Sequence, residues 1–139
     1  MTPRELQTRT KVFALRVIEL VDTLPRSTAG QVIGRQLRRS AASVGANYRA
    51  ACRAQSCAEF AAKLSVVVKE ADESLYWLEL LQESSLIKSQ RLIELLKEAN
   101  ELVAISAAAR KTAKQGAGNG GSSLRCQSSI DNRQSKIVP

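Results

Sequence analysis

Six arginines lie in a stretch of the chain that contains no acidic residue. Between Asp22 and Glu59 these are Arg26, Arg35, Arg38, Arg39, Arg49 and Arg53. A guanidinium group is a planar fork of hydrogen-bond donors that suits a phosphate or a carboxylate. On a helix that turns about 100° per residue, the last five of them share an arc of about 100°. We call these five residues, Arg35, Arg38, Arg39, Arg49 and Arg53, the arginine ridge.

The arginine ridge has two opposed interpretations. One is an electrostatic footprint for the backbone of a nucleic acid. The other is that the arginines pair with carboxylates, within the chain or across an oligomer interface. The next segment supplies many carboxylates, namely Glu59, Glu70, Asp72, Glu73, Glu79 and Glu83. A third, weaker interpretation is a merely solvated face. Ile33, Leu37, Val44 and Tyr48 fall on the opposite side of the same helix and predict its core face.

The remaining residue types give little support for catalysis. The chain contains no His, which removes the usual Ser-His-Asp and Cys-His systems and His-ligated metals. Glu70 and Glu73 share a helix face, as do Glu94, Glu98 and Glu101, but the di-iron helical bundles need Glu-x-x-His pairs. Such glutamates are typical of a salt-bridged solvent face. We therefore predict no catalytic residue, metal, cofactor or small-molecule substrate, and a protein that is not an enzyme.

The cysteine and aromatic residues also give little support for a metal site or a base-stacking site. Three Cys, at 52, 57 and 126, form no C-x-x-C pair, and a zinc site needs about four ligands. We predict free thiols in a reduced, cytoplasmic protein without a membrane span. Tyr76 and Trp77 could stack on bases, but an aromatic pair in an apolar helix more often serves packing.

Four helical segments must position these residues. Aromatics make up only 4% of the 139 residues, and Pro occurs only at 3, 25 and 139. Apolar residues recur at spacings of three and four, as in Leu6, Thr10, Phe13, Val17 and Leu20. The predicted helices run from Pro3 to about Asp22, from Ser27 or Thr28 to about Arg53, from Ser56 to Ser84, and from Ser89 to Lys114. Small residues in the second segment (Gly34, Ala41, Ala42 and Gly45) indicate a close approach by another helix.

The predicted fold is all-α: an antiparallel up-down-up-down four-helix bundle over residues 1–114, followed by a Gly- and Ser-rich, flexible, disordered C-terminal tail over residues 115–139. The first segment carries a second apolar flank, Val12, Leu15 and Ile18, and we expect it to bury two faces. Because a monomeric bundle needs one inward face per helix, the surplus of apolar residues predicts burial between subunits and hence a homo-oligomer.

One stretch resembles a known family. Residues 36–48 (QLRRSAASVGANY), 59–64 (EFAAKL) and 70–80 (EADESLYWLEL) are similar to the small bacterial four-helix bundle proteins encoded within intervening sequences of large-subunit ribosomal RNA genes. The similarity runs from about Glu5 to Lys114. It implies a ring-like homopentamer. Related accessory proteins of diversity-generating retroelements form basic pentamers that bind nucleic acid and a reverse transcriptase. The positions that match them are the arginine ridge.

The chain also departs from this family at one point. Where many members read Asn-Ile-Ala-Glu-Gly, this sequence reads Asn47-Tyr48-Arg49-Ala50-Ala51, so that an acid is replaced and the ridge stays purely basic. Our hypothesis is a non-enzymatic oligomeric bundle that binds RNA or DNA backbone through the arginine ridge. The alternative is a protein-interaction scaffold whose ridge pairs with acidic helices of neighbouring subunits or of a partner protein.

Overall fold

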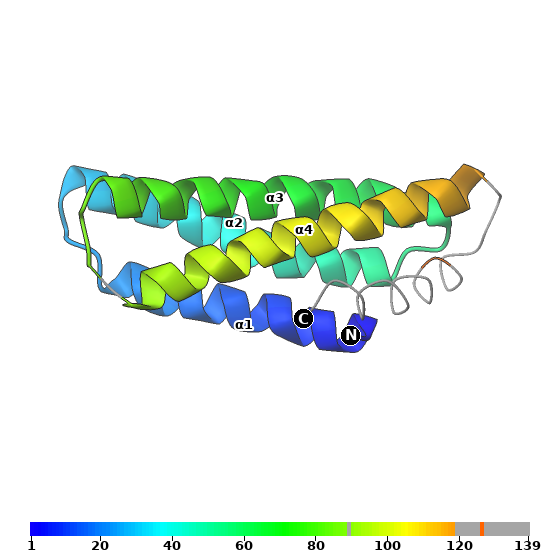
Figure 1. The fold of residues 1–139 in the computed structure, drawn as a ribbon, viewed down its shortest axis with the longest axis horizontal. Coiled ribbons are helices and arrows are strands. Elements are labelled where there is room, and N and C mark those ends of the chain that lie inside the picture. Colours follow the sequence, from blue (N-terminus) through cyan, green and yellow to red (C-terminus); the bar gives the residue numbers. More distant parts are fainter. Residues whose placement is uncertain (89, 119–125, 127–139) are drawn as a thin grey trace.

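The computed structural model describes residues 1–88, 90–118 and Cys126. It contains four helices, α1 (Pro3–Asp22), α2 (Thr28–Cys52), α3 (Cys57–Glu83) and α4 (Gln90–Gly118) (Figure 1). The predicted all-α fold is confirmed, and the predicted helix boundaries agree with these bounds within a few residues. The clearest difference is at the end of α4, which continues beyond the boundary predicted at Lys114. The rest of the predicted tail, apart from Cys126, lies outside the described residues.

Polar side chains cap the starts of three helices, because the first backbone N–H groups of a helix lack partners within it. The Thr2 hydroxyl accepts from the backbone N–H of Glu5, and the Glu5 carboxylate accepts from that of Thr2. The Ser27 and Ser56 hydroxyls cap α2 and α3, as predicted. The predicted cap of the last helix, Ser89, lies outside the described residues.

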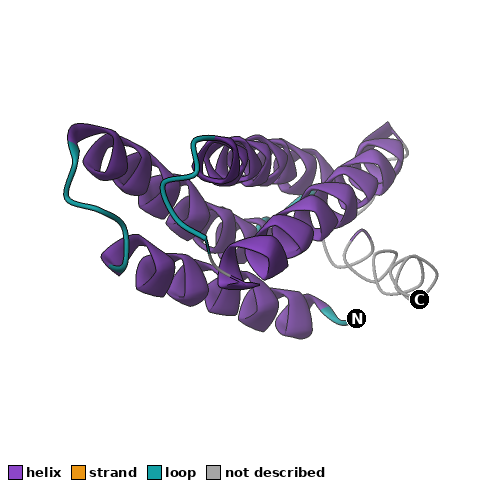
Figure 2. Ribbon diagram, turned by 60° about the vertical axis from the view of Figure 1, so that its left-hand side comes forward, coloured by secondary structure: helices purple, strands orange, loops and turns teal. Residues whose placement is uncertain are grey.

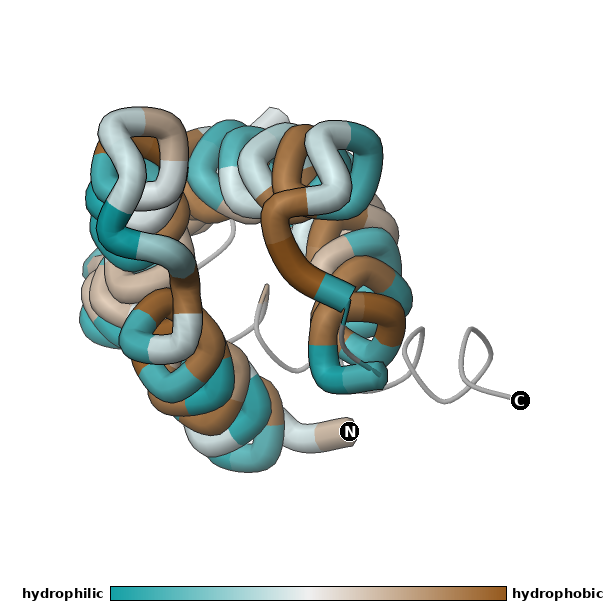
Figure 3. Tube along the Cα trace, turned by 90° about the vertical axis from the view of Figure 1, so that its left-hand side faces the viewer, coloured by the Kyte–Doolittle hydropathy of each residue, from teal (hydrophilic) through white to brown (hydrophobic). Residues whose placement is uncertain are grey.

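The helices run alternately up and down. The α1–α2 and α3–α4 connections lie at one end of the molecule, and the α2–α3 turn lies at the other, near the start of α1 (Figures 1 and 2). Seen end on, the helices follow one another around a central interior, so that α3 lies diagonally opposite α1 (Figure 3). The contact of α2 with α3 and of α3 with α4 is extensive, whereas α1 packs on α2 and touches α4 much less.

The predicted apolar stripes form the core. In α1 all five residues from Leu6 to Leu20 at spacings of four and three are buried, and α3 and α4 bury their stripes in the same way. Polar residues are buried as well, and two of them bond to each other: Ser74 of α3 donates to the hydroxyl of Ser40 in α2 at 2.9 Å. This bond satisfies both groups where the two helices meet.

The second flank of α1 is not buried within the chain. Val12, Leu15 and Ile18 keep 45%, 54% and 38% of their surface exposed. The expected burial of a second face of α1 therefore does not occur within the single chain, where this flank faces solvent. In the described part of the chain, no helix has the length and apolar character needed to cross a membrane.

The prediction of free thiols is wrong for two of the three cysteines. Cys57, the first residue of α3, forms a disulfide with Cys126, with a Cα–Cα distance of 5.9 Å. Gly116 of α4 makes room for it, since a Cβ there would lie 2.6 Å from the Cys126 sulfur. The partners are separated by 69 positions in the sequence, and only the fold brings them together. Cys52 forms no disulfide with any described residue, as predicted.

Candidate nucleic-acid interface

Helix α2 presents the arginine ridge to solvent. All five ridge arginines are exposed, whereas Leu37, Val44 and Tyr48 on the opposite side are buried and Ile33 is half-buried. The predicted division of this helix into a core face and a basic face is therefore confirmed. The ridge does not act as one unit, however, because its members meet three different surroundings.

Arg39 lies toward α3 and is paired within the chain. Its guanidinium lies 3.3 Å from a Glu70 carboxylate oxygen and 2.6 Å from a Glu73 oxygen. The hydrogen bond from Arg39 lowers the pKa of Glu73, and the same bond raises the pKa of Arg39. Trp77 donates its indole N–H to the same Glu73 carboxylate at 3.3 Å. For Arg39, the interpretation in which the ridge pairs with carboxylates of the acidic helix is therefore confirmed.

Arg35 and Arg38 lie near the α1–α2 connection. Together with Arg26 they line a cleft of about 360 Å³ whose other wall includes Val21, Asp22 and Pro25. Gly34 allows α1 to approach here, because a Cβ at this position would lie 3.1 Å from the side chains of Leu24 and Val21. No ion pair of Arg35 or Arg38 is formed with the part of the chain that the structure describes.

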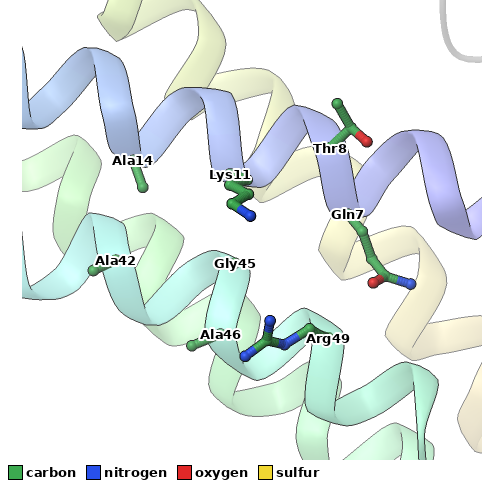
Figure 4. Close-up of a pocket in the computed structure, with 8 residues that line it drawn as sticks. All are labelled: Gln7, Thr8, Lys11, Ala14, Ala42, Gly45, Ala46 and Arg49. Carbon is green, nitrogen blue, oxygen red and sulfur yellow. The ribbon is translucent and has the colours of Figure 1, made fainter.

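Arg49 lies at the opposite end of α2, in a second cleft between α1 and α2 of about 380 Å³. The floor of this cleft consists of small residues, Ala42, Gly45 and Ala46. Lys11 and Gln7 of α1 form the facing wall (Figure 4). A Cβ on Gly45 would lie 3.4–3.5 Å from Thr10 of α1, so the predicted close approach at the small residues is confirmed here and at Gly34.

Lys11 and Gln7 were not among the predicted site residues. The usable signal was that Gln7 and Lys11 are four positions apart, on the flank of α1 that precedes the exposed Leu15. Residues four positions apart lie on one face of a helix and can therefore line the same cleft. The sequence alone does not say which flank of α1 meets α2, and this is why the pair was missed.

The half-buried thiol of Cys52 lies near Gln7, a residue of this cleft. Burial raises the pKa of the Cys52 thiol, while hydrogen bonds with Tyr48 and Gln7 lower it in part. Gln7 therefore lies next to both the Cys52 thiol and the cleft. The two aromatic residues differ: Trp77 is half-buried against the core, whereas Tyr76 is 53% exposed and meets Trp77 edge to face at 5.1 Å.

The glutamates of α4 face α1. Arg9 forms ion pairs with Glu98, at 2.7 Å, and with Glu101, and Arg16 pairs with Glu94 at 3.5 Å. The prediction of a salt-bridged face is confirmed, and the partners of these glutamates are arginines of α1. Within the described ranges, no group of three or more acidic or Cys residues is arranged to hold a metal ion.

Fold, charge and site together define a small basic helical bundle with an exposed arginine face. The chain belongs to the family described as the 23S rRNA-intervening sequence protein, which matches residues 5–108. It is also similar to a solved protein of unknown function from the S23 ribosomal protein family of Bacteroides thetaiotaomicron. The two share 33% identity with a TM-score of 0.73, over 81% of this chain and 100% of the other. No match was found among curated proteins.

Proposed function

We propose that the protein is a non-enzymatic, oligomeric helical bundle that binds the phosphate backbone of RNA or DNA through the arginine ridge. One observation carries the proposal. Arg35, Arg38 and Arg49 of α2 and its C-cap residue Arg53 are exposed, and they form no ion pair with any described residue. The formal net charge of +8 adds a long-range attraction for polyanions.

Binding of this kind is largely independent of base sequence, because guanidinium groups on one exposed ridge contact phosphates and not base edges. Arg39 contributes least, since Glu70 and Glu73 already neutralise it. With four phosphates engaged per chain, the logarithm of the association constant falls with the logarithm of salt concentration with a slope of roughly −3.

The test is the fluorescence anisotropy of labelled RNA and DNA, as duplexes and single strands, titrated at several salt concentrations. The variant with Arg35, Arg38, Arg49 and Arg53 all changed to Gln should lose binding while its circular dichroism stays helical. The matched control is Arg39→Gln, which removes a paired arginine and should retain most of the affinity. Absence of binding by the wild-type protein at low salt would refute the proposal.

Self-association is the second part of the proposal. Its support is the apolar stripe of Val12, Leu15 and Ile18 on α1, which the chain leaves exposed and which a second copy could cover. The homopentamer implied by the family resemblance is the expected form. Analytical ultracentrifugation should give a single oligomer, and Leu15→Glu should dissociate it. A wild-type protein that sediments as a monomer at micromolar concentration would contradict this part.

The alternative function is a protein-interaction scaffold, and the Arg39 ion pairs favour it, because there the ridge already meets an acidic helix. The four-arginine variant separates the two functions. A scaffold would lose its oligomeric state or its partner in that variant, whereas a nucleic-acid-binding protein would keep its sedimentation coefficient and lose only its affinity for RNA and DNA.

A further inference from the structure

The cleft between α1 and α2 brings two cations face to face. Lys11 points from α1 toward α2. The guanidinium of Arg49 lies along α2 and is directed toward the same space (Figure 4). Neither forms an ion pair with a carboxylate of the described residues. Two like charges that share a cleft repel each other. An anion bound between them would be attracted by both, and these attractions would offset the repulsion.

The floor of the cleft leaves space for such an anion. Ala42, Gly45 and Ala46 are the residues of α2 that lie there, and their small side chains leave a volume of about 380 Å³. Ala42 and Ala46 are exposed, so the cleft is accessible from solvent. An anion could therefore reach the ammonium group of Lys11 and the guanidinium group of Arg49 together.

The donors in the cleft suit a phosphate. Lys11 supplies up to three N–H donors, Arg49 supplies a planar fork, and the Gln7 amide supplies a third donor group on the α1 wall. A phosphodiester presents two charged oxygens at a tetrahedral angle, so each can face a donor on a different wall.

We infer that the α1–α2 cleft holds one phosphate of the nucleic-acid backbone between Lys11 and Arg49, with Gln7 as an additional donor. This inference rests on the proposed function and extends it, because it makes α1 part of the binding surface. It also predicts the path of the bound strand along α2. Arg38 and Arg49 are separated by about 16 Å along this helix, at about 1.5 Å per residue. The strand would run from this cleft toward the cleft of Arg35 and Arg38.

The first test removes the charge. Lys11→Gln should lower the affinity for a labelled oligonucleotide about tenfold at low salt and reduce the salt slope by about 0.7–0.9, the share of one phosphate contact. Lys69→Gln is the matched control, because Lys69 is an exposed lysine on α3, diagonally opposite α1. It makes the same change in net charge and should alter the affinity less than about twofold.

The second test fills the cleft without changing the charge. Ala46→Leu places a larger side chain on its floor at an exposed helical position that should tolerate it, and Ala62→Leu is the equivalent change at an exposed position of α3. Only Ala46→Leu should weaken binding, by about threefold to tenfold if one phosphate contact is weakened. Circular dichroism and sedimentation establish that each variant keeps its fold and oligomeric state.

The outcomes separate the inference from the proposed function. If the wild-type protein binds no nucleic acid, the proposed function fails and the inference fails with it. If it binds but Lys11→Gln has no effect, only the inference is overturned. The inference is equally overturned if Lys11→Gln weakens binding while Ala46→Leu does not, because Lys11 then acts through distant charge alone. A change of oligomeric state in either variant would make the cleft a subunit interface and overturn it too.

Discussion

The two long sides of α2 meet neighbours of opposite character. Toward α3, Arg39 is neutralised by Glu70 and Glu73, and Ser40 shares a buried hydrogen bond with Ser74. Toward α1, small residues leave open clefts, and Arg49 faces another cation instead of an acid. The residue type is the same on both sides, so the neighbouring helix decides whether an arginine stabilises the fold or stays available for a ligand.

This contrast also explains where the exposed features gather. The α2–α3 side is closed by packing and ion pairs, and a disulfide joins the start of α3 to Cys126, beside Gly116 of α4. Helix α1 is fastened mainly to α2 and reaches α4 through exposed and half-buried ion pairs. The exposed apolar stripe and both clefts that hold ridge arginines accordingly involve α1 or its connection to α2.

The largest effect should come from removing the covalent link between the start of α3 and Cys126, which has no counterpart at α1. Cys126→Ser removes the disulfide, and the bonded pair is separated by 69 positions, for which loop entropy predicts a loss of about 4 kcal/mol in the free energy of unfolding. Chemical denaturation measures this loss. Hydrogen exchange should increase at the start of α3 and the end of α4 while α1 changes little.

Cys52→Ser is the matched control for this prediction, because it removes a thiol that forms no disulfide. It should cost at most about 1 kcal/mol through its lost hydrogen bonds. Equal stability of Cys126→Ser and the oxidised wild-type protein would show that the disulfide does not hold this end of the bundle, and that packing alone keeps the start of α3 against α4.

The next effect concerns the open side. Gly30→Ala would place a Cβ 2.2 Å from the carbonyl oxygen of Pro25. Because that atom belongs to the backbone of the α1–α2 connection, the connection must shift, and we expect the free energy of unfolding to fall by about 1–3 kcal/mol. Gly118→Ala has no atom within 4 Å and should be neutral or stabilising by up to about 1 kcal/mol. A Gly30→Ala protein as stable as the wild type would mean that α1 is attached too loosely for the clash to matter.

A smaller effect should come from making Arg39 on the α3 side of α2 available to a ligand, as Arg49 is on the α1 side. Glu70→Gln with Glu73→Gln removes both carboxylates that pair with Arg39. The freed guanidinium should raise the affinity for nucleic acid about threefold to tenfold at low salt and steepen the salt slope by about 0.7–0.9. The anisotropy titration described above measures both quantities.

The control is Glu79→Gln with Glu83→Gln, which changes the net charge equally at exposed positions of the same helix. It should increase the affinity less, because it frees no arginine. Equal gains from the two double variants would show that total charge, and not the release of Arg39, governs binding.

Helix periodicity carried most of the fold prediction. Apolar spacing, prolines and the caps Ser27 and Ser56 are local signals, and each one matched an observed helix boundary. The core face of α2 followed from the same periodicity. Pairing between distant segments has no local signal, and the disulfide of Cys57 with Cys126 was missed for that reason.

The candidate site was predictable only in part. The ridge could be located on α2 from its spacing, but the surroundings of each arginine depend on the rotation of α1 and α3 about their own axes. That rotation brings Glu70 and Glu73 to Arg39 and Lys11 to Arg49. From composition alone, the carboxylates of α3 could pair with any arginine of the ridge. In the fold, two of them pair with a single arginine, Arg39.

The smallest expected effect is a dependence of stability on pH at the closed side. The hydrogen bond from Arg39 lowers the pKa of Glu73 in the folded protein, so the folded state binds the proton less readily than the unfolded state does. The stabilisation is therefore complete well above the ordinary Glu pKa of about 4.3, and it is lost as the pH falls through the lower folded value. Since Arg39 is 47% exposed, the effect should be below about 1 kcal/mol.

Urea unfolding of the wild-type protein and Glu73→Gln, between about pH 3 and pH 7, measures this dependence. The wild type should be the more stable at neutral pH, and the difference should disappear in acid, where Glu73 is protonated. Combining Glu73→Gln with Arg39→Gln in a double-mutant cycle assigns the pH-dependent part to the pair. If the coupling between the two residues were absent at neutral pH, Arg39 would be as available to a phosphate as Arg49, and the contrast between the two sides of α2 would rest on packing and not on charge.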